Sequence, residues 1–398
     1  MTDYRGLATT RIYDRRNRLE RLTTPEGVTT YTHNGANQWL TVTYPGGVKQ
    51  EASYDTASRL TGVVNHKSDG TVLSSFTYGL DDMGQKISVT DDVGTTQYRY
   101  DANNRLDLVT EPSGRTTEYT YDGAGNRLTQ TVTPPGGPAE VTSYRYDGAN
   151  RLELVTTPDA TTVSYTFDAR GHLAGDGTNS YEYDGLNRLI AVKQGGATVA
   201  TYGYNGDGLR TQKAVGADIT RYYYDRDRVL NEGDGATVTT SNTWGLGLIR
   251  REKADEEAGY YLFNGHGDVV GVADTTGSML ATYRYDAFGG PESFTGTFDN
   301  PFRYTAEPWD AETGSIYLRA RYYNPSLGRF TTQDTEEPPD FCREVLMACP
   351  YVCLVQSGWW PPPQREVVTL MKFTVEVTLE ELLAALLFTA AAIKFFSN

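Results

Sequence analysis

The chain has 398 residues, a net charge of −15, 38% apolar residues, 29 tyrosines and 41 glycines. This composition favours strands and turns over helices, and the negative charge argues against a basic nucleic-acid surface, so we expect no nucleic-acid partner. All three cysteines follow residue 340, and the opening MTDYRGLATTRIYD lacks the apolar segment of a signal peptide. We therefore expect that the chain stays in the cytosol, leaves by a route that needs no such peptide, or is cut from a longer protein.

One phrase recurs along the first 290 residues, as in YRYDANNRL at 98–106 and YRYDGANRL at 144–152. Alignment on the acid or amide after the aromatic residue gives steps of mostly 20 to 22 residues. The aligned positions are Asp14, Asn34, Asp55, Asp101, Asp122, Asp147, Asp168, Asp184, Asn205, Asp225, Asn264 and Asp286. A fixed period over this length indicates a repeat architecture.

Each unit is predicted to be a β-hairpin. Tyr119 and Tyr121 are two residues apart and share one face of a strand. Asp122 then opens a tight reversal, because aspartate bonds nearby amides and glycine or asparagine accepts positive φ. Arg127 and Leu128 begin the returning strand, with Leu128 expected on the face of the tyrosines. Two strands and two turns in ~20 residues predict a continuous meander of hairpins.

The repeated Tyr, Asp, Arg and Leu are interpreted as structural residues of a sheet wall, because a tyrosine ring buries a large area while its hydroxyl reaches a partner. The alternative is that stacked tyrosines form platforms for sugars, but repetition in every unit favours the wall. This repeat signature comprises Tyr98, Tyr100, Asp101, Arg105, Leu106, Tyr119, Tyr121, Asp122, Arg127, Leu128, Tyr144, Tyr146, Asp147, Arg151, Leu152, Tyr181, Tyr183, Asp184, Arg188 and Leu189.

The phrase Y-x-Y-D-x-x-x-R-L resembles the YD repeat of the rearrangement-hotspot (RHS) family, and NPFRYTAEPWDAETGSIYLRARYYNPSLGRFTTQD, at 300–334, resembles the core segment that closes such arrays. The core motif consists of Tyr317, Arg319, Arg321, Tyr322, Tyr323, Asn324, Pro325, Gly328, Arg329, Phe330 and Asp334. The resemblance implies a β-ribbon that spirals into a hollow shell, often around a C-terminal toxin freed by the shell's own aspartyl protease. The D-P-x-G cleavage motif does not follow Asp334, so we expect no self-cleavage.

The size of the array limits what it can enclose. About 26 strands at ~4.8 Å spacing make a ribbon roughly 120 Å long, or a hoop about 40 Å across. Such a hoop is open above and below, and its first strand, near Arg11–Tyr13, is an unpaired edge. We hypothesise that the chain is the C-terminal end of a longer shell, or that a partner supplies further turns.

Residues 336–398 lack the repeat pattern. Their sequence predicts a proline-bounded linker, a strand near 371–379 and an apolar helix. Between Leu382 and Ile393 there are only 12 uncharged residues, against the roughly 20 that a bilayer requires, so burial is favoured and membrane contact stays open. Cys342, Cys349 and Cys353 are one ligand short of a zinc site, and no histidine follows residue 266. We expect no metal, no cofactor and no catalytic residues.

The predicted fold class is all-β, a spiralling antiparallel β-hairpin ribbon with a short α+β C-terminal tail. Three segments are expected: a YD-repeat array at 1–299, a core segment at 300–335 and a variable tail at 336–398. The predicted function is the shell or delivery scaffold of a bacterial polymorphic-toxin system, secreted or at the cell surface, with the tail as cargo or anchor. Its expected partners are further shell segments or a secretion-system component. Alternatives are a cell-surface glycan-binding module and an inactive displaced fragment.

Overall fold

The computed structural model describes residues 8–254 and 256–333, which lie in one compact unit, and its regular elements there are β-strands and two short 3-10 turns. Within each of the three sheets, every strand is antiparallel to the one before it. The first sheet contains β1 (Thr10–Tyr13), β2 (Leu19–Thr24), β3 (Gly27–His33), β4 (Trp39–Thr43), β5 (Lys49–Tyr54), β6 (Leu60–His66), β7 (Val72–Leu80), β8 (Lys86–Thr90), β9 (Thr95–Tyr100), β10 (Leu106–Thr110), β11 (Thr116–Tyr121), β12 (Arg127–Thr133), β13 (Glu140–Tyr146), β14 (Leu152–Thr156) and β15 (Thr162–Ser164). The all-β class and the meander of hairpins are confirmed.

The second sheet continues the same order. It contains β16 (Thr166–Phe167), β17 (Leu173–Gly175), β18 (Asn179–Tyr183), β19 (Leu189–Gln194), β20 (Ala197–Tyr204), β21 (Arg210–Val215), β22 (Asp218–Asp225), β23 (Arg228–Gly233), β24 (Val238–Trp244), β25 (Leu248–Lys253), β26 (Gly259–Phe263), β27 (Val269–Ala273), β28 (Met279–Tyr285) and β29 (Pro291–Gly296). Strands β1–β29 are called the ribbon below. The predicted count of about 26 strands was too low, because the stretch between Asp225 and Asn264 also forms a hairpin, β24–β25, and because β15 and β16, separated only by Tyr165, are two strands.

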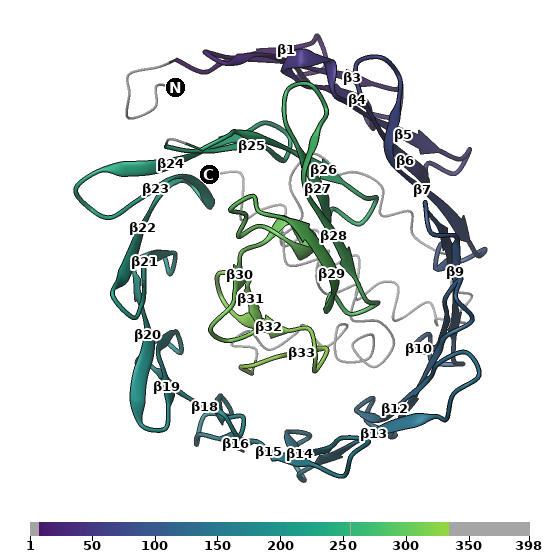
Figure 1. Cartoon of the computed structure of the whole chain (residues 1–398), viewed down its shortest axis with the longest axis vertical. Coiled ribbons are helices and arrows are strands. Elements are labelled where there is room, and N and C mark those ends of the chain that lie inside the picture. The colour runs from purple at the N-terminus through teal and green to yellow at the C-terminus, as the bar shows by residue number, and fades with distance from the viewer. Residues whose placement is uncertain (1–7, 255, 334–398) are drawn as a thin grey trace, which may run out of the picture. The chain divides into compact units, whose positions relative to one another are not determined.

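The ribbon curls so that its last strands lie inside its first ones (Figure 1). The 3-10 turn η1 (Pro45–Gly47), between β4 and β5, lies at this overlap. Gly46 has a φ of +83°, and a Cβ there would lie 2.1 Å from the carbonyl oxygen of Thr275, so glycine is required for the close approach. An apolar cluster that includes Leu22 of β2, Val48 just before β5 and Leu262 of β26 fills the overlap.

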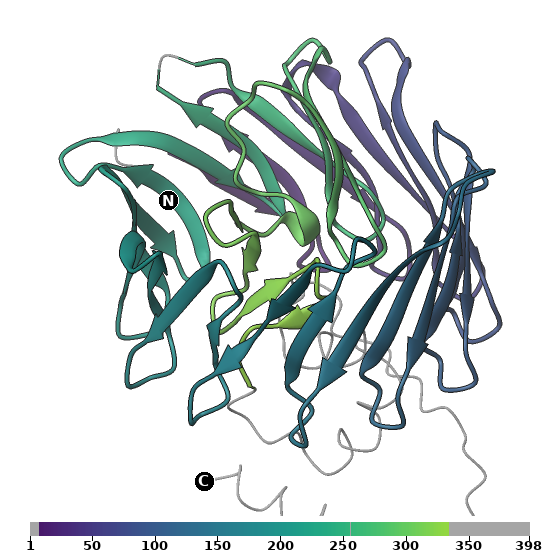
Figure 2. The ribbon, with the colours of Figure 1, turned by 60° about the horizontal axis from the view of Figure 1, so that its bottom comes forward.

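A third sheet lies inside the ribbon, as both views show (Figures 1 and 2). Its strands are β30 (Trp309–Asp310), β31 (Ser315–Tyr317), β32 (Tyr322–Asn324) and β33 (Arg329–Phe330), and the 3-10 turn η2 (Tyr304–Ala306) precedes them. We call it the interior sheet. Tyr317 and Tyr322 pack in one buried cluster with Leu189 and Tyr202 of the ribbon, so the curve of the ribbon is filled on this side.

The predicted edge strand is present. Within residues 8–333, β1 pairs only with β2, and Ile12 and Tyr13 are 44% and 50% exposed. No helix in this part of the chain has the length and apolar character needed to cross a membrane. The expected linker, strand and apolar helix of the tail, its three cysteines and Asp334 lie outside the described residues.

Candidate functional site

The signature aspartates hold the turns of the repeats. Asp101 Oδ1 accepts hydrogen bonds from the backbone N–H groups of Asn103 and Arg105 at 2.8 and 2.9 Å, and its Oδ2 accepts one from Arg105 Nε at 2.7 Å. Asn104 takes the left-handed conformation at φ 60°. Burial raises the pKa of Asp101, but the hydrogen bonds from Arg105 outweigh it and hold that pKa below its usual value. The pairs Asp147–Arg151 and Asp184–Arg188 repeat this geometry.

The second tyrosine of each signature ties its repeat to the preceding one. The Tyr121 hydroxyl donates to the carbonyl of Leu106 at 2.7 Å, 15 residues upstream. Equivalent bonds run from Tyr100 to Lys86, Tyr146 to Arg127, Tyr183 to Leu173, Tyr204 to Leu189, Tyr224 to Arg210 and Tyr285 to Val269. Arg105 adds a bond in the other direction, to the carbonyl of Asp122 at 3.1 Å. The signature therefore fastens successive hairpins together.

The first tyrosine of each Y-x-Y-D signature points into a packed region, so these tyrosines do not form exposed rows. Tyr119 and Tyr144 are only 6% and 7% exposed, and Tyr98 and Tyr181 are half-buried. Leu152 and Leu189 are buried beside them, and Leu106 is half-buried. A sugar cannot stack on rings that other side chains cover, so the burial of Tyr119 and Tyr144 argues against these two rings as sugar platforms.

The expected inward position of Leu128 was wrong. Leu128 is 39% exposed, whereas Arg127 is 8% exposed and lies over the rings of Tyr144 and Phe288 at 4.5 and 5.1 Å. In this turn Asn126 occupies the fourth position after Asp122, where other repeats have arginine. Arginine thus moves to the fifth position, and a shift of one residue sends a strand side chain to the opposite face.

In three repeats a cationic side chain occupies the fifth position after the aspartate or asparagine of the turn. Each of the three lies near the interior sheet or near the last strands of the ribbon. Arg127 donates hydrogen bonds to the carbonyls of Ser326 and Leu327 at 3.2 and 3.0 Å. Lys86 lies 4.9 Å from the centre of the Tyr78 ring, whose hydroxyl accepts a hydrogen bond from the backbone of Gly265. The third is Arg210.

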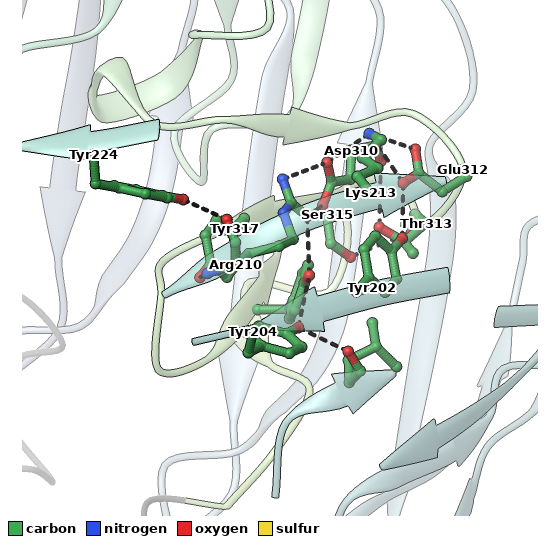
Figure 3. Close-up of polar contacts among 12 residues, drawn as sticks. Tyr202, Tyr204, Arg210, Lys213, Tyr224, Asp310, Glu312, Thr313, Ser315 and Tyr317 are labelled. Carbon is green, nitrogen blue, oxygen red and sulfur yellow. Dashed lines mark hydrogen bonds and ion pairs between the residues drawn. The ribbon is translucent and has the colours of Figure 1, made fainter. Parts of the chain in front are cut away.

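Arg210 is the centre of a buried polar group that we call the anchor cluster (Figure 3). It forms a two-pronged ion pair with Asp310, in which Nη2 lies 3.1 Å from Oδ1, and the two side chains are 2% and 1% exposed. Its Nη1 donates to the Tyr322 hydroxyl at 3.0 Å, and its guanidinium lies 4.2 Å from the centre of the Tyr317 ring. The backbone N–H of Arg210 donates to the Tyr317 hydroxyl at 2.9 Å.

Lys213 and Glu312 complete the anchor cluster. Lys213 Nζ lies 2.7 Å from Asp310 Oδ1 and 3.0 Å from Glu312, which also accepts a hydrogen bond from the Tyr202 hydroxyl at 2.7 Å. Two cations thus face two carboxylates, so the buried charges balance. Burial raises the pKa of Asp310, but Arg210 and Lys213 outweigh it and hold the pKa of that carboxyl below its ordinary value.

The remaining core-motif residues fix the interior sheet at further points. The Tyr323 hydroxyl donates to the Phe288 carbonyl at 2.8 Å, and Arg329 Nη2 donates to the Asn150 carbonyl at 2.9 Å. Arg319 pairs with Glu307 at 2.7 Å, Arg321 lies over Phe330 at 3.8 Å, and Asn324, Pro325 and Gly328 form the turn into β33. The motif therefore joins the interior sheet to the ribbon, and Asp334 is outside the described residues.

This arrangement is suited to holding two parts of a protein together. Its ions are paired and buried, and no group of three or more His, Cys, Asp or Glu within residues 8–333 could hold a metal ion. His172 bonds to Asp168 at the fourth position after that aspartate, where other repeats have arginine, and His266 bonds to Asp268 within the turn that follows Asn264. The geometry thus supports a joint between ribbon and interior sheet.

Comparison with known families decides the classification. A family model described as Teneurin YD-shell matches residues 83–344, about two thirds of the chain, and a model described as RHS Repeat matches residues 13–49. The chain belongs to the teneurin YD-shell family. The family predicted from the repeat and core motifs is confirmed.

Curated relatives of this YD-shell chain are much longer proteins. The tRNA3(Ser)-specific nuclease WapA of Bacillus spizizenii is 33% identical over 320 residues, which are 78% of this chain and 13% of that protein. The tRNA nuclease WapA of Bacillus subtilis is 33% identical over 250 residues, which are 61% of this chain and 10% of that protein. The chain therefore spans about a tenth of the length of these relatives.

Solved toxin-complex structures share the fold of the YD-shell. The TcdB2–TccC3–TEV complex has a TM-score of 0.70 and 21% identity, over 84% of this chain and 19% of that chain. The Tc holotoxin pore of Photorhabdus luminescens has a TM-score of 0.71 and 22% identity, over 85% of this chain and 19% of that chain. The chain thus has the same fold as this part of the toxin complexes.

Sequence reasoning missed the anchor cluster of the YD-shell. Asp310 and Glu312 lie within the core segment, but nothing in their immediate sequence identifies their partners. The available signal was the spacing between the aspartate or asparagine of the turn and the following arginine. This spacing is five residues from Asn205 to Arg210 and from Asp122 to Arg127, but four residues in most repeats. A cation at the fifth position marks an inward side chain.

Proposed function

We propose that the chain is a scaffold that surrounds the polypeptide following its interior sheet, as part of a bacterial polymorphic-toxin system. The observation that carries the proposal is the anchoring of the core segment inside the ribbon by the anchor cluster. This attachment of the interior sheet to the ribbon sets the direction in which the following polypeptide leaves the sheet.

The exit point of the core segment supports enclosure. The backbone N–H of Leu173 in β17 donates to the carbonyl of Thr331 at 2.9 Å, just after β33. A Cβ on Gly171 would lie 2.9 Å from the Gln333 side chain, so the turn before β17 also touches this segment. Residues 331–333 therefore lie against the ribbon, next to the interior sheet.

We further propose a division of labour along the chain. The array at 1–299 and the core segment at 300–335 serve as the scaffold without catalysis or self-cleavage, and the tail at 336–398 is cargo or anchor. The nuclease activity named for the WapA relatives belongs to proteins of which this chain matches about a tenth. Synthesis in the bacterial cytoplasm, followed by secretion or display at the cell surface with further shell segments or a secretion-system component, fits this role.

Protease accessibility tests the enclosure. One variant of the full chain carries a protease site after Gln333, and a matched control carries it between Gly195 and Gly196, an exposed turn of the ribbon. We expect cleavage after Gln333 to be slower by about tenfold or more, because it requires an opening of the fold. Equal rates in the two variants would show that the segment is not enclosed. Growth of cells that express the full chain, with and without 336–398, then tests the tail as a toxin.

A further inference from the structure

The last strand of the ribbon has an unpaired edge. β29 lies inside the curve of the ribbon (Figure 1), and within residues 8–254 and 256–333 it pairs with β28 alone. All six of its residues are exposed, whereas Ala281 and Tyr283 of β28 are 1% and 4% exposed. The N–H and C=O groups on the other side of such a strand can pair with a further strand.

A second strand edge inside the ribbon shows how the fold covers such backbone groups. β25 pairs with only the first two residues of β26. Beyond them, the Tyr261 carbonyl accepts a hydrogen bond from Gln50 Nε2 at 2.8 Å, and the Phe263 carbonyl accepts one from Asn65 Nδ2 at 3.1 Å. No described residue of the chain covers the backbone of β29 in this way. The edge of β29 is therefore open to an added strand.

The two faces of β29 differ in chemistry. Phe294 lies opposite Tyr283 with the two ring centres 5.2 Å apart, and its side chain is 49% exposed. Thr295 lies opposite Thr282, and the two hydroxyl oxygens are 2.6 Å apart. Because successive side chains of a strand point to opposite faces, an added strand would meet an aromatic ring on one face and hydroxyl groups on the other. Such a strand fits best when apolar residues alternate with threonine or serine.

Negative charge gathers at the start of β29. Glu292 shares the face of Phe294, two residues away. Asp286, in the preceding turn, accepts only backbone hydrogen bonds, and neither acid forms an ion pair with another residue that the structure describes. The surrounding ribbon keeps water from Glu292 and raises its pKa, the carboxylates of Glu111 and Asp286 raise it further, and two nearby arginines offset this only in part. A lysine or arginine in the added strand would relieve this crowding of negative charge.

We infer that the free edge of β29 binds an extended segment of the enclosed polypeptide as a further strand. In this segment apolar and hydroxyl-bearing residues alternate, and a lysine or arginine lies two residues from an apolar one. Backbone hydrogen bonds to the edge supply affinity, and the alternating side chains supply selectivity. An extended chain can reach an edge inside the ribbon, whereas the folded bulk of a second copy cannot (Figures 1 and 2). The inference rests on the enclosure proposed above.

Hydrogen exchange of the full chain with synthetic peptides tests the edge. The probe is the peptide TKTVTVTKT, in which lysine and valine share one face of an extended strand and threonine occupies the other. The controls are the scrambled peptide TTKVVKTTT and the acidic peptide TETVTVTET. At about 1 mM probe we expect the N–H groups of residues 292–296 to exchange at least about tenfold more slowly, which corresponds to a Kd of about 0.1 mM or tighter. Exchange in residues 281–284 of β28, which pair on both sides, should not change.

Three results would overturn the inference. The first is unchanged exchange of 292–296 in the presence of the probe. The second is equal protection by either control peptide. The third is slow exchange of 292–296 before any peptide is added, which would mean that the edge is already paired. Slow protease cleavage after Gln333 together with any of these results would leave the enclosure standing and refute the binding of a strand to β29.

Variants of the full chain locate the binding. Phe294→Ala removes the exposed ring and should weaken the protection by about threefold or more. The matched control is Val141→Ala, at a 45% exposed residue of β13, which has a partner strand on each side, and it should leave the protection unchanged. Circular dichroism and thermal unfolding check that each variant is folded. If Phe294→Ala does not fold, Glu292→Gln replaces it, and the lysine peptide should then lose its advantage over the acidic one. Undiminished protection in the folded variants would place the peptide elsewhere and refute the site.

Discussion

Replacement of Asp310 by asparagine tests whether the anchor cluster holds the interior sheet. The substitution keeps the size of the side chain and removes its charge. Arg210, which is 2% exposed, then loses its carboxylate partner, while Lys213 keeps Glu312 at 3.0 Å. A buried charge without its partner is strongly unfavourable, because it has neither water nor a counter-ion.

The expected loss follows from this burial. Removal of one partner of a buried ion pair typically costs about 3–5 kcal/mol, so we expect Asp310→Asn to lower the free energy of unfolding by about that amount. The matched control is Glu153→Gln, which breaks an exposed pair with Arg145, whose side chains are 51% and 64% exposed. Exposed pairs contribute about 1 kcal/mol or less, so the control should be nearly neutral.

Guanidinium denaturation followed by near-ultraviolet circular dichroism measures the free energy of unfolding. Repeat arrays can unfold in parts, so hydrogen exchange is needed to localise the effect. We expect faster exchange in 309–330 and unchanged exchange in β2–β5, which do not touch the anchor cluster. The double variant Arg210→Met, Asp310→Leu removes both charges, and we expect it to recover about 2 kcal/mol or more of the loss.

Two results would refute this reasoning. One is a loss in Asp310→Asn no larger than that in Glu153→Gln. The other is faster exchange throughout the ribbon with none specific to the interior sheet, which would mean that the cluster stabilises the fold in general and is not a joint.

Three further predictions concern the repeats and the pH dependence. Tyr121→Phe removes a hydroxyl bonded to the preceding repeat and should lower the free energy of unfolding by about 1 kcal/mol, whereas Tyr13→Phe, at a half-exposed ring, should leave the denaturation midpoint unchanged. Leu152→Ala should lower the free energy of unfolding by about 2–5 kcal/mol by opening a cavity, while Leu128→Ala should lower it by less than about 0.5 kcal/mol. Equal losses in the two variants would show that Leu128 is buried like Leu152. The pKa of Asp310 is lowered in the folded state, so its ionised form stabilises the fold above the unfolded-state pKa of about 3.9, and this contribution is lost as pH falls through the folded-state pKa. The free energy of unfolding should therefore depend less steeply on acid pH in Asp310→Asn than in the unmodified chain. Identical curves for the two proteins would contradict this.

Local chemistry in the sequence was sufficient for the hairpins. The period of the signature predicted the meander because an aspartate that caps a turn and an asparagine or glycine at positive φ act within five residues. The unpaired edge near Arg11–Tyr13 followed from the same order of strands. The position of Leu128 was missed because the extra residue after Asp122 moves arginine to the inward face, although this spacing can be read from the sequence.

Alternation along a strand defines two faces but does not say which face becomes the inside, nor where the curved ribbon meets itself. Those choices depend on contacts between residues far apart in the chain, such as Arg210 with Asp310 and Leu22 with Leu262. The period of the repeat is therefore a property of the sequence alone. The filled interior and the buried charges of the anchor cluster exist only because the tertiary structure brings distant strands together and removes water between them.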